Sequence, residues 1–303
     1  MSDRVKATVS SAMLLPVFVL LFVLSAFLPG PLFAQDAELL ARVDALIEEE
    51  KPRDALALME RFSGNAEIYW RRAQATLIIG DQRKDAGAPD SELLEIFARG
   101  EAFADQAIAA DPRKPEGYYW KSANIGRWGQ TRGVLNSLFR ASDMRGLLEQ
   151  AIALDPSHGD SFFVLAQLYA KVPGVVSFGN NAYAVSLGWK AVHLMEAEVA
   201  SGERDKPIEA YYVELGSHLI DRGWNERRRG RSMGGITSSY RSASTPLEQG
   251  YFYEGSLNRP NRSDQEEARE VLQGTIRRLQ AIRNPLPSET RRLQQAQELL
   301  AGI

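Results

Sequence analysis

One phrase recurs along this chain: Ala107-Ile108-Ala109-Ala110-Asp111-Pro112 returns as Ala151-Ile152-Ala153-Leu154-Asp155-Pro156, and a proline-free version stands at Ala191-Val192-His193-Leu194. Each version closes a stretch of helical periodicity, and an aromatic-rich helical opening follows it. Helix pairs that repeat in this way bury their apolar sides against the next pair. The sequence therefore predicts an all-α superhelix of helical hairpins.

Apolar residues at three- and four-residue spacing predict the first helices of this array. The expected ranges are Asp36–Glu49, Pro52–Phe62, Ala66–Ile79 and Ser91–Ala110. A polar loop is expected over Gly80–Asp90 between the last two. Ser91 is the expected N-cap, since its hydroxyl can accept a hydrogen bond from a free amide of the first turn.

The helical openings resemble the first helix of the tetratricopeptide (TPR) unit, in which an aromatic residue precedes Leu-Gly and a second aromatic residue. The matching stretches are Phe162-x-x-Leu165-Ala166-x-x-Tyr169, Tyr212-x-x-Leu215-Gly216-x-x-Leu219 and Trp70-x-x-Ala73-Gln74-x-x-Leu77. Asp111-Pro112 and Asp155-Pro156 resemble the close of the unit, and Ala184 and Ala191 resemble its small second-helix positions. The resemblance covers Asp36–Trp224 and implies a divergent TPR array. The segment Tyr118–Val192 also resembles exported bacterial TPR-like proteins and, more remotely, the TPR component of TRAP transporters.

The spacing departs from the family. From Ala107 to Ala151 is 44 positions and from Ala151 to Ala191 is 40, against a period of about 34. Two inserted segments are therefore expected. The first is a sharply bent, glycine-rich turn over Gly126–Gly133 followed by a short helix Val134–Arg140, and the second is Val172–Asn181, with Asn180 or Asn181 as a helix N-cap.

In the TPR family the first helices line a concave groove, and this implies groove positions in the present chain. These are Tyr119, Ala123, Gly126 and Arg127, then Phe163, Gln167, Ala170 and Lys171, then Val213, Ser217 and Asp221. The inserted segments add Trp128, Phe178 and Asn180 as binding candidates. Aromatic rings beside cations suit a peptide or a carboxylate-bearing ligand. The alternatives stay open: Arg127 and Lys171 are merely solvated, Phe178 packs in the core, and the neighbouring rings Tyr118, Trp120, Phe162 and Tyr212 belong to the core.

The first 34 residues have the order of a secretory signal peptide. Arg4 and Lys6 precede the uncharged run Met13–Leu28, and Pro29-Gly30-Pro31 and Ala34 follow it. The run has 16 residues, fewer than the ~20 that span a bilayer comfortably. We expect cleavage near Ala34 and a periplasmic protein, with an uncleaved inner-membrane anchor as the alternative.

The C-terminal third divides into an irregular segment and two helices. Residues 225–262 are expected to form an irregular Arg-, Gly- and Tyr-rich loop that packs on the array, after the array itself at 35–224. Residues 263–303 are expected to form capping helices. Ser263-x-x-Glu266 is a capping box that opens the first of them.

Composition excludes several classes of function. The formal net charge of −3 gives no electrostatic case for nucleic acid as a partner, and the absence of cysteine excludes disulfides and a cysteine-linked lipid. The three histidines form no recognised ligand set; His193 and Glu196 are an isolated i, i+3 pair. No phosphate loop, dinucleotide fingerprint or nucleophile elbow occurs in the sequence. We therefore expect neither an enzyme nor a cofactor.

Two functions remain after these exclusions. The first is an exported scaffold that binds a protein or peptide partner in the bacterial cell envelope, and the second is a small-ligand carrier or transporter accessory. An open groove would favour the scaffold, and an enclosed apolar cavity would favour the carrier. Membrane contact is expected only if the leader stays uncleaved.

Overall fold

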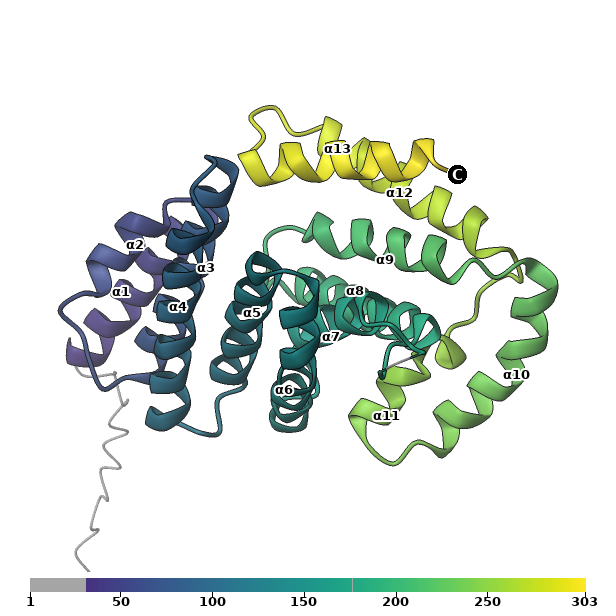
Figure 1. Cartoon of the computed structure of the whole chain (residues 1–303), viewed down its shortest axis with the longest axis horizontal. Helices are drawn as coiled ribbons and strands as arrows, with labels where there is room; N and C mark the ends of the chain where they lie inside the picture. Colours follow the sequence, from purple (N-terminus) through teal and green to yellow (C-terminus); the bar gives the residue numbers. More distant parts are fainter. Residues whose placement is uncertain (1–30, 176) are drawn as a thin grey trace, which may run out of the picture.

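The computed structural model describes residues 31–175 and 177–303, and within them the chain is all-α (Figure 1). The expected superhelix of helical hairpins is confirmed. The helices are α1 Pro31–Glu48, α2 Pro52–Met59, α3 Ala66–Asp85, α4 Asp90–Ala110, α5 Pro115–Arg132, α6 Val134–Leu154, α7 Gly159–Lys171, α8 Asn181–Ser201, α9 Glu209–Arg222, α10 Glu226–Ser242, α11 Pro246–Tyr251, the 3₁₀ helix η1 Tyr253–Ser256, α12 Asp264–Gln280 and α13 Pro287–Ala301.

Successive helices pair as hairpins, and the first helix of each hairpin packs on the first helix of the next. This holds for α1 with α3, α3 with α5, α5 with α7 and α7 with α9. The first helices therefore line the inner side of the array. Close packing needs small residues: Gly80 of α3 lies against the ring of Phe97, and Gly100 of α4 lies against Asn124, where a Cβ would overlap either neighbour.

The apolar core continues along the array, as in other repeat proteins. Its largest part lies between α5 and α9, where Phe162, Leu165, Leu187 and Leu215 are fully buried. A second part joins α1, α2 and α3, and a third joins α9, α12 and α13 around Leu272.

Several helix boundaries differ from the predicted ones. The helix predicted to end at Ile79 continues to Asp85, so the polar loop expected over Gly80–Asp90 is wrong in its first half. Helix α4 starts at Asp90 with Pro89 at its cap, and Ser91 therefore lies inside the helix. Proline at the cap position fixes the extended backbone that precedes a first turn.

The first predicted insertion is also wrong. Residues Gly126–Arg132 continue α5, and only Gly133 has a positive φ, of 99°. The helix predicted over Val134–Arg140 is the start of α6. Gly126 packs against Met144 of α6, so tertiary packing favours a helix over a turn here. The extra residues thus lengthen a hairpin.

The second predicted insertion is a loop between α7 and α8. The backbone N–H of Asn180 donates to the Tyr169 carbonyl at 2.9 Å, which closes this loop on α7. The Asn180 side chain accepts from the amides of Ala182 and Tyr183, and its predicted N-cap role is confirmed. The proline-free phrase Ala191–Leu194 lies inside α8, which runs on to Ser201, and it does not close that helix.

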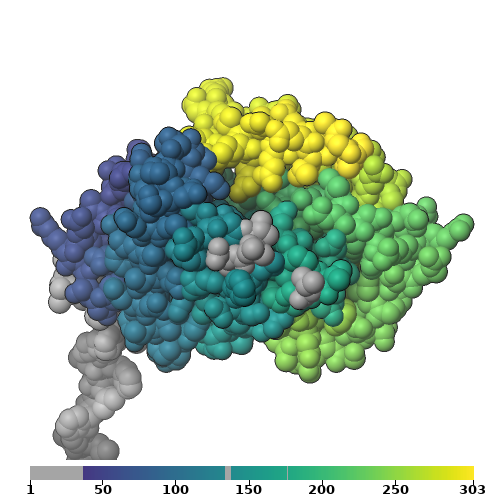
Figure 2. Space-filling view, in the orientation of Figure 1, coloured from purple at the N-terminus to yellow at the C-terminus, as the bar shows by residue number. Residues whose placement is uncertain are grey.

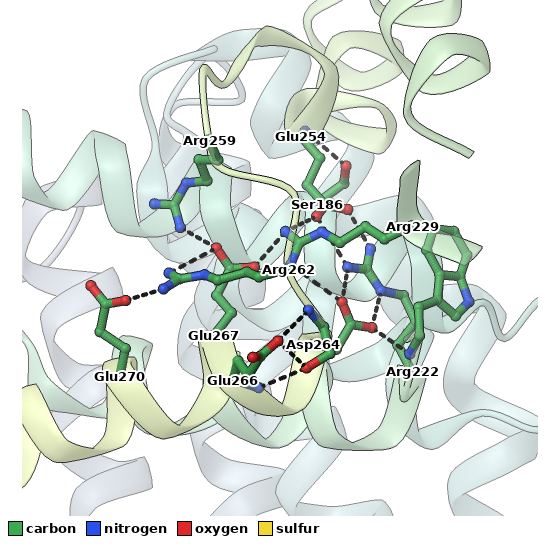
Figure 3. A network of polar contacts seen from close by, with 12 residues as sticks. Ser186, Arg222, Arg229, Glu254, Arg259, Arg262, Asp264, Glu266, Glu267 and Glu270 are labelled. Atoms are coloured by element: carbon green, nitrogen blue, oxygen red, sulfur yellow. Dashed lines mark hydrogen bonds and ion pairs between the residues drawn. The ribbon is translucent and has the colours of Figure 1, made fainter. Parts of the chain in front are cut away.

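The segment predicted to be irregular, residues 225–262, contains α10, α11 and η1, so that prediction is wrong. Figure 3 shows the ion network that orders it. Arg222 of α9 binds Glu254 and, at 2.6 Å, Asp264, while Arg229 of α10 binds Glu254 and Glu267. All five side chains are at most 5% exposed. The sequence of α10 shows no apolar stripe of helical period, because the buried residue of this helix is an arginine, Arg229.

The C-terminal helices α12 and α13 form a hairpin that packs along α9 and spans the top of the molecule in Figure 1. The predicted capping box at Ser263 and Glu266 is confirmed. At the tip of the hairpin, Arg291 lies 2.8 Å from Asp85 of α3, and the Ser288 amide donates to Glu50 at 3.1 Å. The C-terminal hairpin therefore reaches back to the first hairpins of the array.

Most of the predicted signal peptide, residues 1–30, lies outside the described residues. Its last residues, Pro31–Ala34, are in the first turn of α1. Among the described residues, no helix combines the length and the apolar character needed to cross a bilayer.

Candidate functional site

A groove of about 500 Å³ opens between α2 and α4. It lies on the outer side of the array, because the inward packing of α1, α3 and α5 leaves the second helices apart. Leu56 and Ile96 form apolar walls, and the buried Ile79 of α3 forms the floor. The full lining is Arg53, Leu56, Ala57, Glu60, Ile79, Glu92, Glu95, Ile96 and Arg99. We call it the α2–α4 groove.

The rim of the α2–α4 groove carries both signs of charge on each wall. Arg53 and Glu60 come from the α2 side, and Glu92, Glu95 and Arg99 come from α4. The pKa of Glu92 is lowered, first by a hydrogen bond from Arg83 at 2.5 Å and also by the charge of Arg53 across the groove.

Four of these rim charges are free to bind something else. Among the described residues, no ion pair or side-chain hydrogen bond engages Arg53, Glu60, Glu95 or Arg99. An apolar floor with a rim of both charges suits a peptide segment that inserts an apolar side chain and pairs its flanking charges.

The predicted inner-face aromatic residues are mainly structural. Tyr119 is only 8% exposed and packs edge-to-face on Trp120, so its assignment to the groove is wrong. Burial raises the pKa of its hydroxyl well above the usual value. Phe163 is half-buried and stacks on Tyr211 with ring centroids 4.3 Å apart. These rings hold α5, α7 and α9 together.

Arg127 does not act as a free groove cation. Its guanidinium binds both oxygens of Asp81 on α3, with Nε 2.8 Å from Oδ1. Trp128 lies beneath the guanidinium groups of Arg132 and Arg140, at 5.6 and 5.8 Å from its ring centroid. Both side chains therefore stabilise packing between helices.

The remaining predicted residues are divided between surface and core. Lys171 is exposed and Gln167 is half-buried on α7, and no ion pair engages either side chain within the described part of the chain. Phe178 packs on Tyr169 at 5.4 Å between ring centroids, with the Arg145 guanidinium 4.5 Å from its own centroid. Phe178 therefore packs against the core, which is the second of the two roles that the sequence left open for it.

The other positions that the TPR resemblance implied also vary. Val213 is fully buried, so its placement in a groove is wrong, whereas Asp221 is exposed. Four further positions are half-buried: Ala123, Gly126, Ala170 and Ser217. Of the four rings expected in the core, Phe162 is fully buried, and Tyr118, Trp120 and Tyr212 are half-buried.

Helix α13 lies over part of the inner face that the sequence predicts to be a binding groove. Gln295 donates to Glu214 of α9 at 3.3 Å, and Arg292 lies 3.7 Å from the same carboxylate. Burial lowers the pKa of the Arg292 guanidinium; Glu214 opposes this shift, and the nearby Arg127 and Arg291 add to it. Helix α13 thus covers the inner face of the array beside α9. Figure 2 shows the C-terminal helices against the N-terminal hairpins.

One buried titratable side chain, His218, belongs neither to the α2–α4 groove nor to the predicted inner groove. His218 of α9 is 1% exposed, and neither of its ring nitrogens has a hydrogen-bond partner. Burial, with the charge of Lys171, lowers its pKa to about 3, so the ring is neutral at pH 7. Among the described residues, no three His, Cys, Asp or Glu side chains are arranged to hold a metal ion.

Comparison with known proteins gives one family match. The family model for regulator of microtubule dynamics protein 1-3 matches residues 39–177, which run from α1 to the α7–α8 loop and include the α2–α4 groove. No curated protein matches the chain. The family match agrees with a helical repeat fold over these residues.

Sequence reasoning missed the α2–α4 groove. It used Leu56 only as part of the apolar stripe that packs α2 into the core, and it gave no role to the charges around it. A signal was present in the spacing of the charges: Glu92, Glu95 and Arg99 follow one another at three and four residues on α4, and Arg53 and Glu60 are seven residues apart at the two ends of α2. Whether the charges of α2 and α4 face each other depends on how the two hairpins pack, and the sequence pattern of each helix does not specify that packing.

Proposed function

We propose that this chain is a scaffold that binds a protein partner through a peptide segment in the α2–α4 groove. One observation supports it most: an open groove of about 500 Å³ has an apolar floor and a rim of both charges, of which only Glu92 is engaged in an ion pair among the described residues. A peptide with one apolar anchor and flanking charges of both signs satisfies each part of this surface.

The shape of the site favours a peptide over a small apolar ligand. Five of the nine lining residues are charged, whereas small-ligand sites are mostly apolar with few polar groups. A smaller hollow of about 310 Å³ lies at the C-terminal end, lined by Ile220, Leu299 and Ile303 among others. This apolar hollow is the place where the alternative function, a small-ligand carrier or transporter accessory, would bind its molecule.

We also propose that the scaffold works in the bacterial cell envelope and belongs among the TPR-like proteins. The support is the leader sequence, with its basic start and uncharged run, and the TPR-like phrases of the first helices. The family match carries a description that concerns microtubule dynamics, but it covers less than half of the chain, and that activity is not part of our proposal. Recovery of the protein in a periplasmic extract, with an N-terminus near Gln35, would support the location; retention in carbonate-washed membranes would support an anchor instead.

Charge reversal in the groove tests the proposed function. The variant Arg53→Glu/Arg99→Glu changes one cation on each wall, and both side chains are exposed, so folding should be unaffected. The matched control Arg61→Glu/Arg283→Glu reverses two exposed arginines outside the groove. Partner yield after crosslinking in intact cells should fall for the groove variant and stay normal for the control. Equal yields for both variants would contradict the proposal.

A further inference from the structure

Helix α10 turns an arginine-rich side away from the rest of the chain, at the right-hand edge of Figure 1. Eight exposed residues lie on one side of this helix, which we call the α10 outer face: Arg227, Arg228, Arg231, Gly234, Gly235, Ser238, Arg241 and Ser242. The exposed Glu226 and Gly230 lie beside this face. Helical geometry gathers the residues of the face within about two fifths of the helix circumference. The face extends about 21 Å from Arg227 to Arg241, at ~1.5 Å per residue.

The arginines of the α10 outer face have no carboxylate partner among the described residues. Arg227, Arg231 and Arg241 form no ion pair, and Arg228 only lies over the Trp224 ring, 5.1 Å from its centroid. The fifth arginine of the helix behaves differently: Arg229 points inward and binds Glu254 and Glu267. The outer face is therefore strongly cationic on a chain whose formal net charge is −3.

The centre of this face is destabilising for the chain itself. Gly234 and Gly235 lie inside the helix with ordinary negative φ, and a Cβ at either would have no atom within 4 Å. Glycine in a helix interior is less stable than alanine. Other glycines in this region have a packing reason, since Gly255 presses against the backbone of Thr237 and Gly230 approaches Asn261. No contact within the described residues explains why glycine stands at positions 234 and 235. Residues that oppose the local secondary structure without a packing reason are expected at functional surfaces.

We propose that the α10 outer face is a docking surface for an acidic helical segment of a partner protein. Arginines at both ends can bind carboxylates through two hydrogen bonds each, which fixes a partner in place. The glycines between them carry no side chain, so a partner helix can approach the backbone of α10 closely there. This surface lies on the opposite end of the array from the α2–α4 groove, and the inference does not depend on the function of that groove.

A lipid surface fits the face less well than an acidic helix does. Helices that lie on bilayers bury apolar side chains at the interface, and the α10 outer face exposes only arginine, glycine and serine. Its charges alone would hold a membrane, and salt would screen that attraction. Anionic vesicles are therefore an arm of the test.

The experiment measures binding of the full chain to a labelled alanine-based helix with glutamates along one face, by fluorescence anisotropy at low ionic strength. The triple variant Arg227→Gln/Arg231→Gln/Arg241→Gln should weaken binding at least about tenfold. The matched control Arg61→Gln/Arg277→Gln/Arg283→Gln removes three exposed arginines elsewhere and should bind like the unchanged chain. A peptide with the same glutamates spread around the helix should bind poorly.

The variant Gly234→Gln/Gly235→Gln separates docking from simple charge attraction. It keeps every arginine and covers the bare backbone with two side chains, and it should raise the melting temperature because glutamine favours helix over glycine. Peptide binding should nevertheless fall about tenfold. Unchanged binding by this variant, equal binding of the spread-charge peptide, or no peptide binding at all would overturn the proposal. Stronger capture by phosphatidylglycerol vesicles than by the peptide would overturn it in favour of a lipid surface.

Discussion

Arg291 of α13 lies 2.8 Å from Asp85 at the end of α3, so the last helix of the chain is joined to the second hairpin. Both side chains are about half exposed, at 51% and 47%. The neighbouring contact, from the Ser288 amide to Glu50, is also polar. Apolar packing around Leu272 and Ala296 holds the other end of the C-terminal hairpin. The tip of this hairpin is therefore its weaker attachment.

Charge reversal at the tip should loosen it without unfolding the protein. In Arg291→Glu we expect faster amide hydrogen exchange in the first turns of α13 and unchanged exchange near Ala296. The global cost should be within about 1 kcal/mol, since an exposed ion pair contributes little. High salt should have the same local effect on the unchanged chain. The control Arg277→Glu alters an exposed arginine of α12 that has no ion pair; equal exchange in both variants would contradict the attachment.

Core and surface positions of α7 should respond differently to truncation. Leu165→Ala should cost about 2–5 kcal/mol, because Leu165 is fully buried in the largest part of the core. Lys171→Ala should stay within about 0.5 kcal/mol, since Lys171 is exposed. Arg127→Ala should fall between them, at about 0.2–1 kcal/mol, through loss of its partly exposed pair with Asp81. Urea denaturation measures all three, and a cost for Arg127→Ala equal to that of Leu165→Ala would be inconsistent with this geometry.

The ion network around Glu254 should be essential for folding of the C-terminal third. Glu254→Gln removes a carboxylate to which both buried arginines of this network, Arg222 and Arg229, donate hydrogen bonds. It should cost about 3–5 kcal/mol although Asp264 and Glu267 remain. The matched control Glu270→Gln removes a carboxylate that is 66% exposed and bound to Arg262, and should cost less than about 1 kcal/mol. Thermal unfolding of the two variants compares these costs; similar melting temperatures would show that the network contributes little.

Acid should destabilise the protein through His218. Its pKa is about 3 in the folded chain, against an ordinary value of 6.5, so below pH 6.5 the unfolded chain binds a proton that the folded chain does not. The free energy of unfolding therefore keeps its full value above pH 6.5, and the contribution of His218 lowers it progressively as the pH falls from there toward 3. The loss at pH 5 relative to pH 7 is about 2 kcal/mol.

The variant His218→Leu isolates this contribution. It removes the titrating ring and its two unpartnered nitrogens, and its stability should change less between pH 7 and pH 5 than that of the unchanged chain. His158→Asn is the control, because asparagine can keep the cap that His158 provides at Ser161 and His218 stays in place. An unchanged pH profile in His218→Leu would show that the ring is not buried in its neutral form.

The hairpin architecture was predictable because its signals are local. The Asp-Pro closes of α4 and α6 and the cap at Asn180 each depend on a few neighbouring residues, and the structure has all of them. The failures occurred where distant packing overrides local preference. Gly126 predicts a turn, yet its contact with Met144 of α6 keeps it helical. Arg229 predicts a solvated charge, yet it is buried with carboxylates from two other elements.

The candidate sites were less predictable than the fold. The TPR resemblance implied an inner groove, but Tyr119 is in the core, Arg127 is paired with Asp81, and α13 occupies space beside Glu214. The α2–α4 groove depends on the distance between two helices that do not follow one another in sequence. No pattern within either helix specifies that distance.

Site-specific photocrosslinking tests the proposed groove most directly. A photoreactive residue in place of Ala57, which lines the α2–α4 groove, should form an adduct with a partner protein in intact cells, and one in place of the exposed Ala281 should not. Adding Arg53→Glu/Arg99→Glu should abolish the adduct at Ala57. An adduct at Ala281 as strong as that at Ala57, or an adduct at Ala57 that survives charge reversal, would contradict a partner-binding role for this groove.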